Sequence, residues 1–268
     1  MTDGRSFIFG RNRIGYDDPV GAHSGRLPVV LVHGSSVHRA IWDPVVATLG
    51  RRYRPISFDH PGHGMSSLPG CASVEALSDL LEGLHAELGI AQSVLIGFSL
   101  GGAVAQLFHA RHPDRILALG LVSTAPDFGL PNELVARWRA DAAAYAEDEL
   151  SLSLAPMATD ATRERIVALR CGVTAEGQLA DLAACASWNN PTALAGIACP
   201  LLAMTASHDI PGLKQQAARW ARDVPGSRLV EIADAGHFML AEQPEASADA
   251  ILAWLISLDL DPARDHGP

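Results

Sequence analysis

The chain has 268 residues, of which 48% are hydrophobic and 19% are charged, which is the composition of a globular protein long enough to bury a full core. Its formal net charge of −10 argues against nucleic acid and against anionic membrane surfaces as partners. The four cysteines form no C-x-x-C pair and no cysteine–histidine cluster with zinc spacing, so we expect reduced thiols and no metal site.

Short apolar segments alternate with helical patterns along the first half of the chain. We expect an edge hairpin from strands at 6–9 and 13–16, then buried strands at 28–34, 54–58 and 94–96. The helices expected between them span 40–49, 73–89 (capped by Ser73) and 100–112. No signal peptide is visible and no apolar stretch reaches membrane-spanning length, which predicts a soluble, cytoplasmic protein.

The second half opens with an apolar strand at 116–122 and then loses strand character for about 70 residues. A loop at 123–130 leads into helices predicted at 133–147, 160–169 and 176–186. The remaining predicted elements are a strand at 200–204, a helix at 213–223, a strand at 227–232 and a helix at 242–256.

This alternation of strands and helices predicts an α/β fold, with a mostly parallel sheet covered by helices on both faces. We expect the core to comprise residues 1–126 and 191–258, with a helical insertion at 127–190. Residues 259–268 are expected to form a disordered tail.

One strand and one helix meet at the pentapeptide Gly97-Phe98-Ser99-Leu100-Gly101. A chain that changes from strand to helix within one residue strains that residue, and glycines at 97 and 101 remove the Cβ atoms that would clash there. The turn lifts Ser99 above the sheet at a helix N-terminus, which favours negative charge. The pattern is that of a G-x-S-x-G nucleophile elbow.

Three further polar motifs follow the ends of predicted strands: His33-Gly34-Ser35, Asp209 and His237. In a parallel sheet these ends share one edge, so we expect Ser99 and His237 to converge there. A serine hydroxyl needs a base near neutral pH, histidine suits that task, and a carboxylate holds the imidazole tautomer. The chain order Ser99, Asp209, His237 favours Asp209 as the acid, with Asp127 as its rival.

An oxyanion formed at Ser99 needs two backbone N–H donors. The N–H of Leu100, directly after the serine and at a helix start, is expected to supply one. The N–H of Ser35, in the loop after the first buried strand, is the expected second. His60 and His63 are interpreted as turn-building residues that brace this side of the site.

Together these motifs resemble the α/β-hydrolase superfamily over nearly the whole chain. The matching segments are His33-Gly34 with Trp42 following, Asp59-His-Pro-Gly-His-Gly-Met-Ser66, Gly97-Phe-Ser-Leu-Gly-Gly102, Ala206-Ser-His-Asp209 and Gly236-His-Phe-Met-Leu-Ala-Glu-Gln-Pro244. The resemblance implies an eight-stranded sheet with a helical cap inserted after strand 6. It also implies Ser99 as nucleophile, His237 as base and Asp209 as acid, with no cofactor.

Departures from related families narrow the expected chemistry. Haloalkane dehalogenases and epoxide hydrolases carry Asp where this chain has Ser99. Hydrolases that cleave C–C bonds of dienoate ring-fission products carry Asn and Trp where this chain has Phe98 and Phe238. The elbow looks like those of cofactor-free haloperoxidase/esterases and enol-lactonases. We therefore expect a serine hydrolase that cleaves a carboxylic ester or lactone of a small-molecule substrate.

Two alternatives stay open: a C–C bond hydrolase of a ring-fission-type diketone acid, and a non-catalytic ligand-binding protein with a hydrolase fold. The expected pocket is apolar, and the candidate residues for it are Ser36, His38, Phe98, Phe128, Trp138, Trp188 and Phe238. The arginines of the helical insertion are expected mostly on solvated faces. They are Arg137, Arg139, Arg163, Arg165 and Arg170. The oligomeric state stays open.

Overall fold

The computed structural model describes residues 4–130, 133–190, 192 and 196–260. Within them the chain forms an eight-stranded sheet in the order β1-β2-β4-β3-β5-β6-β7-β8. Its strands are β1 (Arg5–Phe9), β2 (Asn12–Asp17), β3 (Pro28–Val32), β4 (Arg54–Phe58), β5 (Ser93–Phe98), β6 (Ile116–Val122), β7 (Leu201–Ala206) and β8 (Arg228–Ile232). The β1–β2 hairpin is antiparallel and lies at one edge, β2 pairs antiparallel with β4, and the pairings from β4 through β8 are parallel. The predicted sheet and edge hairpin are confirmed.

Alternation along the buried strands explains why helices cover both faces. In β3, Val29 and Leu31 face one apolar cluster, whereas Val30 and Val32 face another. Because successive side chains point to opposite faces, a strand that is apolar throughout needs cover on both.

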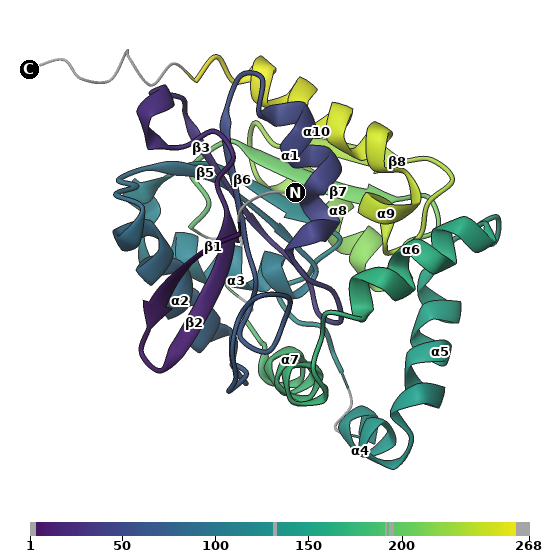
Figure 1. Cartoon of the computed structure of the whole chain (residues 1–268). Coiled ribbons are helices and arrows are strands. Elements are labelled where there is room, and N and C mark those ends of the chain that lie inside the picture. Colours follow the sequence, from purple (N-terminus) through teal and green to yellow (C-terminus); the bar gives the residue numbers. More distant parts are fainter. Residues whose placement is uncertain (1–3, 131–132, 191, 193–195, 261–268) are drawn as a thin grey trace, which may run out of the picture.

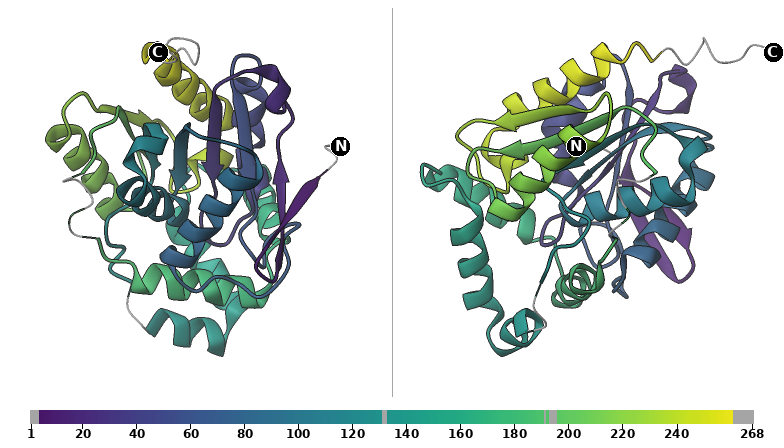
Figure 2. Two further views of the ribbon diagram at one scale, coloured as in Figure 1. Left: turned by 90° about the vertical axis from the view of Figure 1, so that its left-hand side faces the viewer. Right: turned by 180° about the vertical axis from the view of Figure 1, so that it is seen from behind.

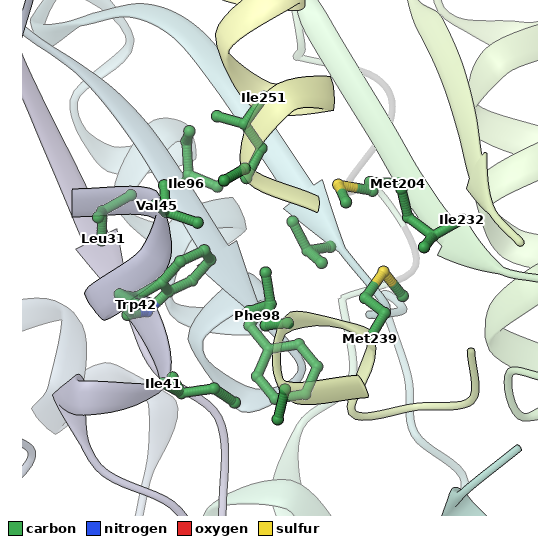
Figure 3. Close-up of a cluster of buried hydrophobic side chains, with 14 of the residues drawn as sticks. Leu31, Ile41, Trp42, Val45, Ile96, Phe98, Met204, Ile232, Met239 and Ile251 are labelled. Atoms are coloured by element: carbon green, nitrogen blue, oxygen red, sulfur yellow. The ribbon is translucent and has the colours of Figure 1, made fainter. Parts of the chain in front are cut away.

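The first cluster lies between the sheet and α1 (Asp43–Leu49) and α10 (Pro244–Ser257), which contact each other. Figure 3 shows Trp42 and Val45 from the α1 side, Ile251 from α10, and Ile96 and Met204 from the strands. The opposite face packs against α2 (Val74–Glu87), α3 (Leu100–Arg111) and α8 (Pro211–Asp223).

The four helices inserted between β6 and β7 lie outside these two layers but contact both (Figures 1 and 2). They are α4 (Glu133–Ala140), α5 (Ala142–Ser153), α6 (Asp160–Arg170) and α7 (Ala175–Ser187). The sequence predicts one helix over 133–147, but Asp141 interrupts it. Its side chain accepts from Ala144 N at 3.0 Å, so it ends α4 and caps α5.

Other helix boundaries differ from the predictions for similar local reasons. The helix predicted from residue 242 begins instead at Pro244, after the short α9 (Met239–Glu242), because proline suits a first helical turn. Ser73 caps α2 as expected and accepts from Ala76 N at 3.2 Å.

The four cysteines form no disulfide in the structure. No helix in the described ranges has both the length and the apolar character needed to cross a bilayer. Most of the predicted disordered tail, residues 261–268, lies outside the described residues.

Candidate active site

Ser99 occupies the one-residue junction between β5 and α3. Its backbone, with φ 52° and ψ −117°, lies outside the regions that non-glycine residues normally adopt. A Cβ at position 97 would overlap the carbonyl of Gly101, and one at position 101 would overlap the carbonyl of Val32. Both glycines are therefore required for the sharp turn that presents the Ser99 hydroxyl.

His237 lies in the loop between β8 and α9, 138 residues from Ser99 in the sequence, and its Nε2 is 3.2 Å from Ser99 Oγ. The backbone N–H of His237 donates to the carbonyl of Ser153 at 2.6 Å, at the end of α5. The Glu242 carboxylate accepts from the N–H of Gly236 at 2.9 Å. The histidine is therefore held from the helical insertion and from α9.

Asp209 lies just past the end of β7 and is almost fully buried. Its Oδ1 is 3.2 Å from His237 Nδ1 and accepts from the N–H of Ile210 at 2.8 Å. Its Oδ2 accepts from Thr205 Oγ1 at 2.9 Å and from Ser123 Oγ at 2.5 Å.

Burial by itself raises the pKa of Asp209, but hydrogen bonds from His237, Ser123 and Thr205 outweigh it and hold the pKa below its ordinary value. The carboxylate is therefore ionised at neutral pH. A negative charge at this position orients the His237 ring so that Nδ1 carries a proton and Nε2 faces Ser99.

Ser123 is a site residue that the sequence analysis missed. It follows β6 with φ 49°, and its Oγ is 2.9 Å from His237 Nδ1 as well as 2.5 Å from Asp209. The sequence could have identified Ser123, because it ends a buried strand that lies beside the Ser99 strand, at the same edge of the sheet.

Asp127, the rival acid, lies away from the histidine. Its side chain is exposed and accepts from the N–H of Gly129 at 2.7 Å. Within the described part of the chain the carboxylate hydrogen-bonded to His237 is that of Asp209.

The loop after β3 lies directly beside the elbow. A Cβ at Gly34 would be 3.0 Å from Ser99 Cβ, so this loop passes the hydroxyl closely. Leu100 is the first residue of α3, where N–H groups have no intrahelical partner. The N–H of Ser35 donates to no other residue in the described ranges. Both expected donors thus belong to segments that lie beside Ser99.

A buried ion pair between Asp181 and His63 anchors the loop after β3. The Asp181 carboxylate, on α7, lies 2.9 Å from His63 Nε2 and accepts from the N–H of Ser36 at 3.2 Å. Burial lowers the pKa of His63, but the Asp181 charge outweighs it and raises the pKa above its ordinary value. His33 accepts from His60 N at 2.9 Å, so its ring also ties the two loops together.

The predicted pocket residues separate into three groups. Ser36 and Trp138 line a cavity of about 270 Å³ beneath the helical insertion. Phe98 and Phe238 are buried and flank the His237 ring, at 5.1 and 5.5 Å between ring centroids. The others lie elsewhere: His38 caps a short 3₁₀ helix, Trp188 is buried and donates to Ala125 O, and Phe128 packs on the α3 side.

The cavity contains a charged pair. Arg170 and Glu149 both line it, with Arg170 Nη2 donating to Glu149 Oε2 at 2.9 Å. The Arg170 side chain is only 14% exposed, and its guanidinium lies 5.5 Å from the Phe238 ring centroid. Of the arginines expected on solvated faces, this one therefore faces the interior. The remaining lining residues are Tyr145, Ala146, Val173, Thr174, Ala175 and Gln178.

Comparisons with known proteins agree with the fold described above. The sequence model described as the alpha/beta hydrolase family matches residues 29–250. A pimeloyl-(acyl-carrier protein) methyl ester esterase from Chromobacterium violaceum is 32% identical over 232 residues, which cover 80% of this chain and 89% of the relative.

Solved structures with the same fold cover nearly the whole chain. An enol-lactonase from Burkholderia xenovorans LB400 superposes with a TM-score of 0.84 at 24% identity, over 94% of this chain and all of the lactonase. A thermophilic esterase from Thermogutta terrifontis, solved with malate bound, superposes with a TM-score of 0.83 at 28% identity, over 97% of this chain and all of the esterase.

Proposed function

The chain belongs to the α/β-hydrolase family, and from that premise we propose that it hydrolyses a carboxylic ester or lactone through an acyl-enzyme on Ser99. The observation that carries the proposal is the hydrogen-bonded series from Ser99 Oγ through His237 to Asp209, mounted on a strained turn. Such a series is the arrangement that activates a serine for attack on an acyl carbon. The esterase similarity supports the same reaction class.

In the first half-reaction, Ser99 Oγ attacks the carbonyl carbon while its proton passes to His237 Nε2. The carbonyl oxygen becomes an oxyanion, which accepts hydrogen bonds from the N–H groups of Leu100 and Ser35. The bond from carbon to the alcohol oxygen then breaks, and the alcohol takes the proton from His237. In a lactone the alcohol stays attached to the acyl group.

In the second half-reaction, a water gives its proton to His237 and attacks the acyl carbon. Collapse of this intermediate returns the proton to Ser99 and releases the carboxylic acid. Asp209 stabilises the imidazolium that forms in each half, because its carboxylate is ionised and bonded to Nδ1.

The helical insertion, residues 127–190, serves in this proposal as a cap that bounds the substrate pocket. Its support is that the cavity is lined both by Ser36, next to the proposed oxyanion donor, and by residues of α4 through α7. The reaction as written uses side chains, backbone N–H groups and water, with neither metal nor organic cofactor.

Covalent labelling tests the nucleophile directly. We expect an aryl phosphonate ester to add one phosphonyl group to Ser99, and Ser99→Ala to abolish both this label and the burst of nitrophenol from a nitrophenyl ester. Ser187→Ala, at an exposed serine of α7, is the matched control and should keep both. Mapping of the label to another residue would overturn the elbow assignment, and a wild-type protein without label or turnover would favour a non-catalytic binding protein.

One observation favours a second function, C–C cleavage of a ring-fission-type diketone acid. Such a substrate carries a carboxylate that needs a cationic partner when it is buried, and Arg170 lines the cavity. The Glu149 carboxylate already occupies that arginine, so we expect esters to be the better substrates. The check is kcat/KM for a short aryl ester series against a vinylogous 1,5-diketone acid, and faster turnover of the acid would reverse the ranking.

A further inference from the structure

The cavity beneath the helical insertion contains hydrogen-bond donors that the protein does not use. Within the described residues, Arg170 Nε and Gln178 Nε2 are buried and have no hydrogen-bond partner, and both residues line the cavity. Buried donors are almost always paired in folded proteins, because leaving one unpaired forfeits its hydration without compensation. Two of them lie in one cavity, where a bound group that accepts hydrogen bonds would pair them.

Each terminal nitrogen of the Arg170 guanidinium already makes one hydrogen bond. Its Nη1 donates to the carbonyl of Ala146 at 2.9 Å, and its Nη2 donates to Glu149 at 2.9 Å. These contacts fix the plane of the guanidinium beside the Phe238 ring, so Nε is presented at a defined position. A ligand oxygen that reached it would meet a donor that is already oriented.

The charge of this cavity selects against an anionic ligand. Glu149 supplies one carboxylate against one guanidinium, so the pair carries no net charge when both are ionised. Burial raises the pKa of Glu149, although Arg170 opposes that change. A second carboxylate beside Glu149 would add repulsion and burial in the same small space.

The cavity borders the loop that passes beside Ser99. Ser36 lines it and follows Gly34 and Ser35, which pass directly beside Ser99. The Arg170 guanidinium and the His237 ring each lie 5.5 Å from the centroid of the Phe238 ring. A substrate chain would run from Ser99 past Ser36 into the cavity.

We propose that the cavity bounded by Arg170, Gln178 and Glu149 binds an uncharged oxygen at the end of the substrate remote from the ester, such as a terminal hydroxyl or amide. The oxygen accepts from Arg170 Nε and Gln178 Nε2, and a hydroxyl or amide N–H also donates to Glu149. This inference rests on the proposed ester hydrolysis and specifies its substrate class. It replaces the expectation of a purely apolar pocket.

The test compares kcat/KM within matched ester series. One series carries four- to eight-carbon acyl chains on a nitrophenyl leaving group, ending in methyl, hydroxyl, primary amide or carboxylate. The other carries the same endings on the alcohol side of acetate esters. In at least one series the wild-type protein should prefer the hydroxyl or amide ending over methyl by about tenfold or more, with carboxylate the poorest.

Two variants separate the roles of the lining residues. Gln178→Leu removes one unused donor with little change in volume and should reduce the preference for hydroxyl over methyl by at least about threefold. Glu149→Gln leaves Arg170 with its charge unopposed and should raise the ratio of carboxylate to hydroxyl turnover by about tenfold. Glu147→Gln, at an exposed position two residues earlier on α5, should leave both ratios at wild-type values.

The outcomes distinguish failure of this inference from failure of the proposed function. Phosphonate labelling of Ser99 in each variant reports whether the reactive site is intact. If esters are cleaved but methyl endings equal hydroxyl and amide endings in both series, the inference is wrong and the hydrolase proposal stands. Wild-type preference for carboxylate, or unchanged ratios in Gln178→Leu and Glu149→Gln, would also overturn it. If no ester is cleaved and Ser99 is not labelled, the proposed function itself is wrong.

Discussion

The carboxylate oxygens of Asp209, at the edge of the sheet, are all hydrogen-bonded, whereas two buried donors in the helical insertion are not. At the edge, the two oxygens of Asp209 accept hydrogen bonds from His237, Ser123, Thr205 and Ile210. In the insertion, Arg170 and Gln178 line a cavity with buried donors that no described residue accepts from. The Asp209 carboxylate is fully paired without a ligand, whereas a ligand would pair the two donors of the cavity.

The helix that follows Ser99 is also more deeply buried than the first helix of the insertion. Most of α3, which follows Ser99, is buried against the sheet, but α4 buries none of its residues. Strands fixed by hydrogen bonds on both sides position their end residues closely, whereas helices that share little apolar surface adjust more easily. We infer that the sheet edge determines the chemistry and that the insertion determines which substrate is accepted.

The largest effect on activity is expected from substitution of Asp209, at the edge of the sheet. Asp209→Asn places an amide where the protein donates several hydrogen bonds, and it allows the wrong His237 tautomer. In the serine protease template such a change lowers kcat about 10⁴-fold, and we expect a loss of that order with a nitrophenyl ester. Asp127→Asn, at the exposed rival position, should leave kcat within about twofold. The reverse ranking would move the acid away from the strand end.

A smaller effect is expected at Ser123, which adds to the Asp209–His237 contact without replacing it. Ser123→Ala removes the 2.5 Å bond to Asp209 and the 2.9 Å contact with His237 Nδ1. The three other bonds to Asp209 remain, so we expect kcat to fall about tenfold with KM nearly unchanged. Ser123→Gly also lacks the hydroxyl but suits the positive φ, and it should lose kcat to the same extent. A loss in Ser123→Ala that Ser123→Gly does not share would mean that the position matters for backbone conformation and not for its hydroxyl.

The contact between the two regions is tested at Asp181, which joins α7 to the loop of Ser36. Asp181→Asn leaves His63 buried without its charged partner, and we expect unfolding free energy to fall by about 3 kcal/mol at pH 6. The folded pKa of His63 is raised, so the pair's stabilisation is present below the unfolded pKa and is lost as pH rises through the folded value.

Urea unfolding at pH 6 and pH 9 measures this difference. The gap between wild type and Asp181→Asn should narrow at the higher pH, while Asp148→Asn, at an exposed position of α5, should give a small and constant change. A gap that did not change between pH 6 and pH 9 would show that His63 is neutral in the folded protein at both pH values.

The elements of this fold were predictable because their patterns are local. A wholly apolar segment such as Val29 to Val32 must be covered on both faces, and the glycines at 97 and 101 are explicable from the turn they permit. The convergence of Ser99, Asp209 and His237 followed from one rule, that parallel strands end at a common edge. Helix boundaries were less accurate, because single residues such as Asp141 and Pro244 decided them.

What the sequence determined by itself was therefore the sheet, the elbow and the residues at the strand ends, since each depends on spacing along the chain. Only the tertiary structure decided that Ser123 joins Asp209, that Asp181 holds the Ser36 loop, and that Arg170 faces inward against Glu149. These contacts connect residues from 21 to 145 positions apart, on elements whose relative placement no periodicity encodes. The sequence pattern around an arginine on an amphipathic helix is the same whether the side chain faces water or a cavity, because a long side chain with a charged end fits both environments.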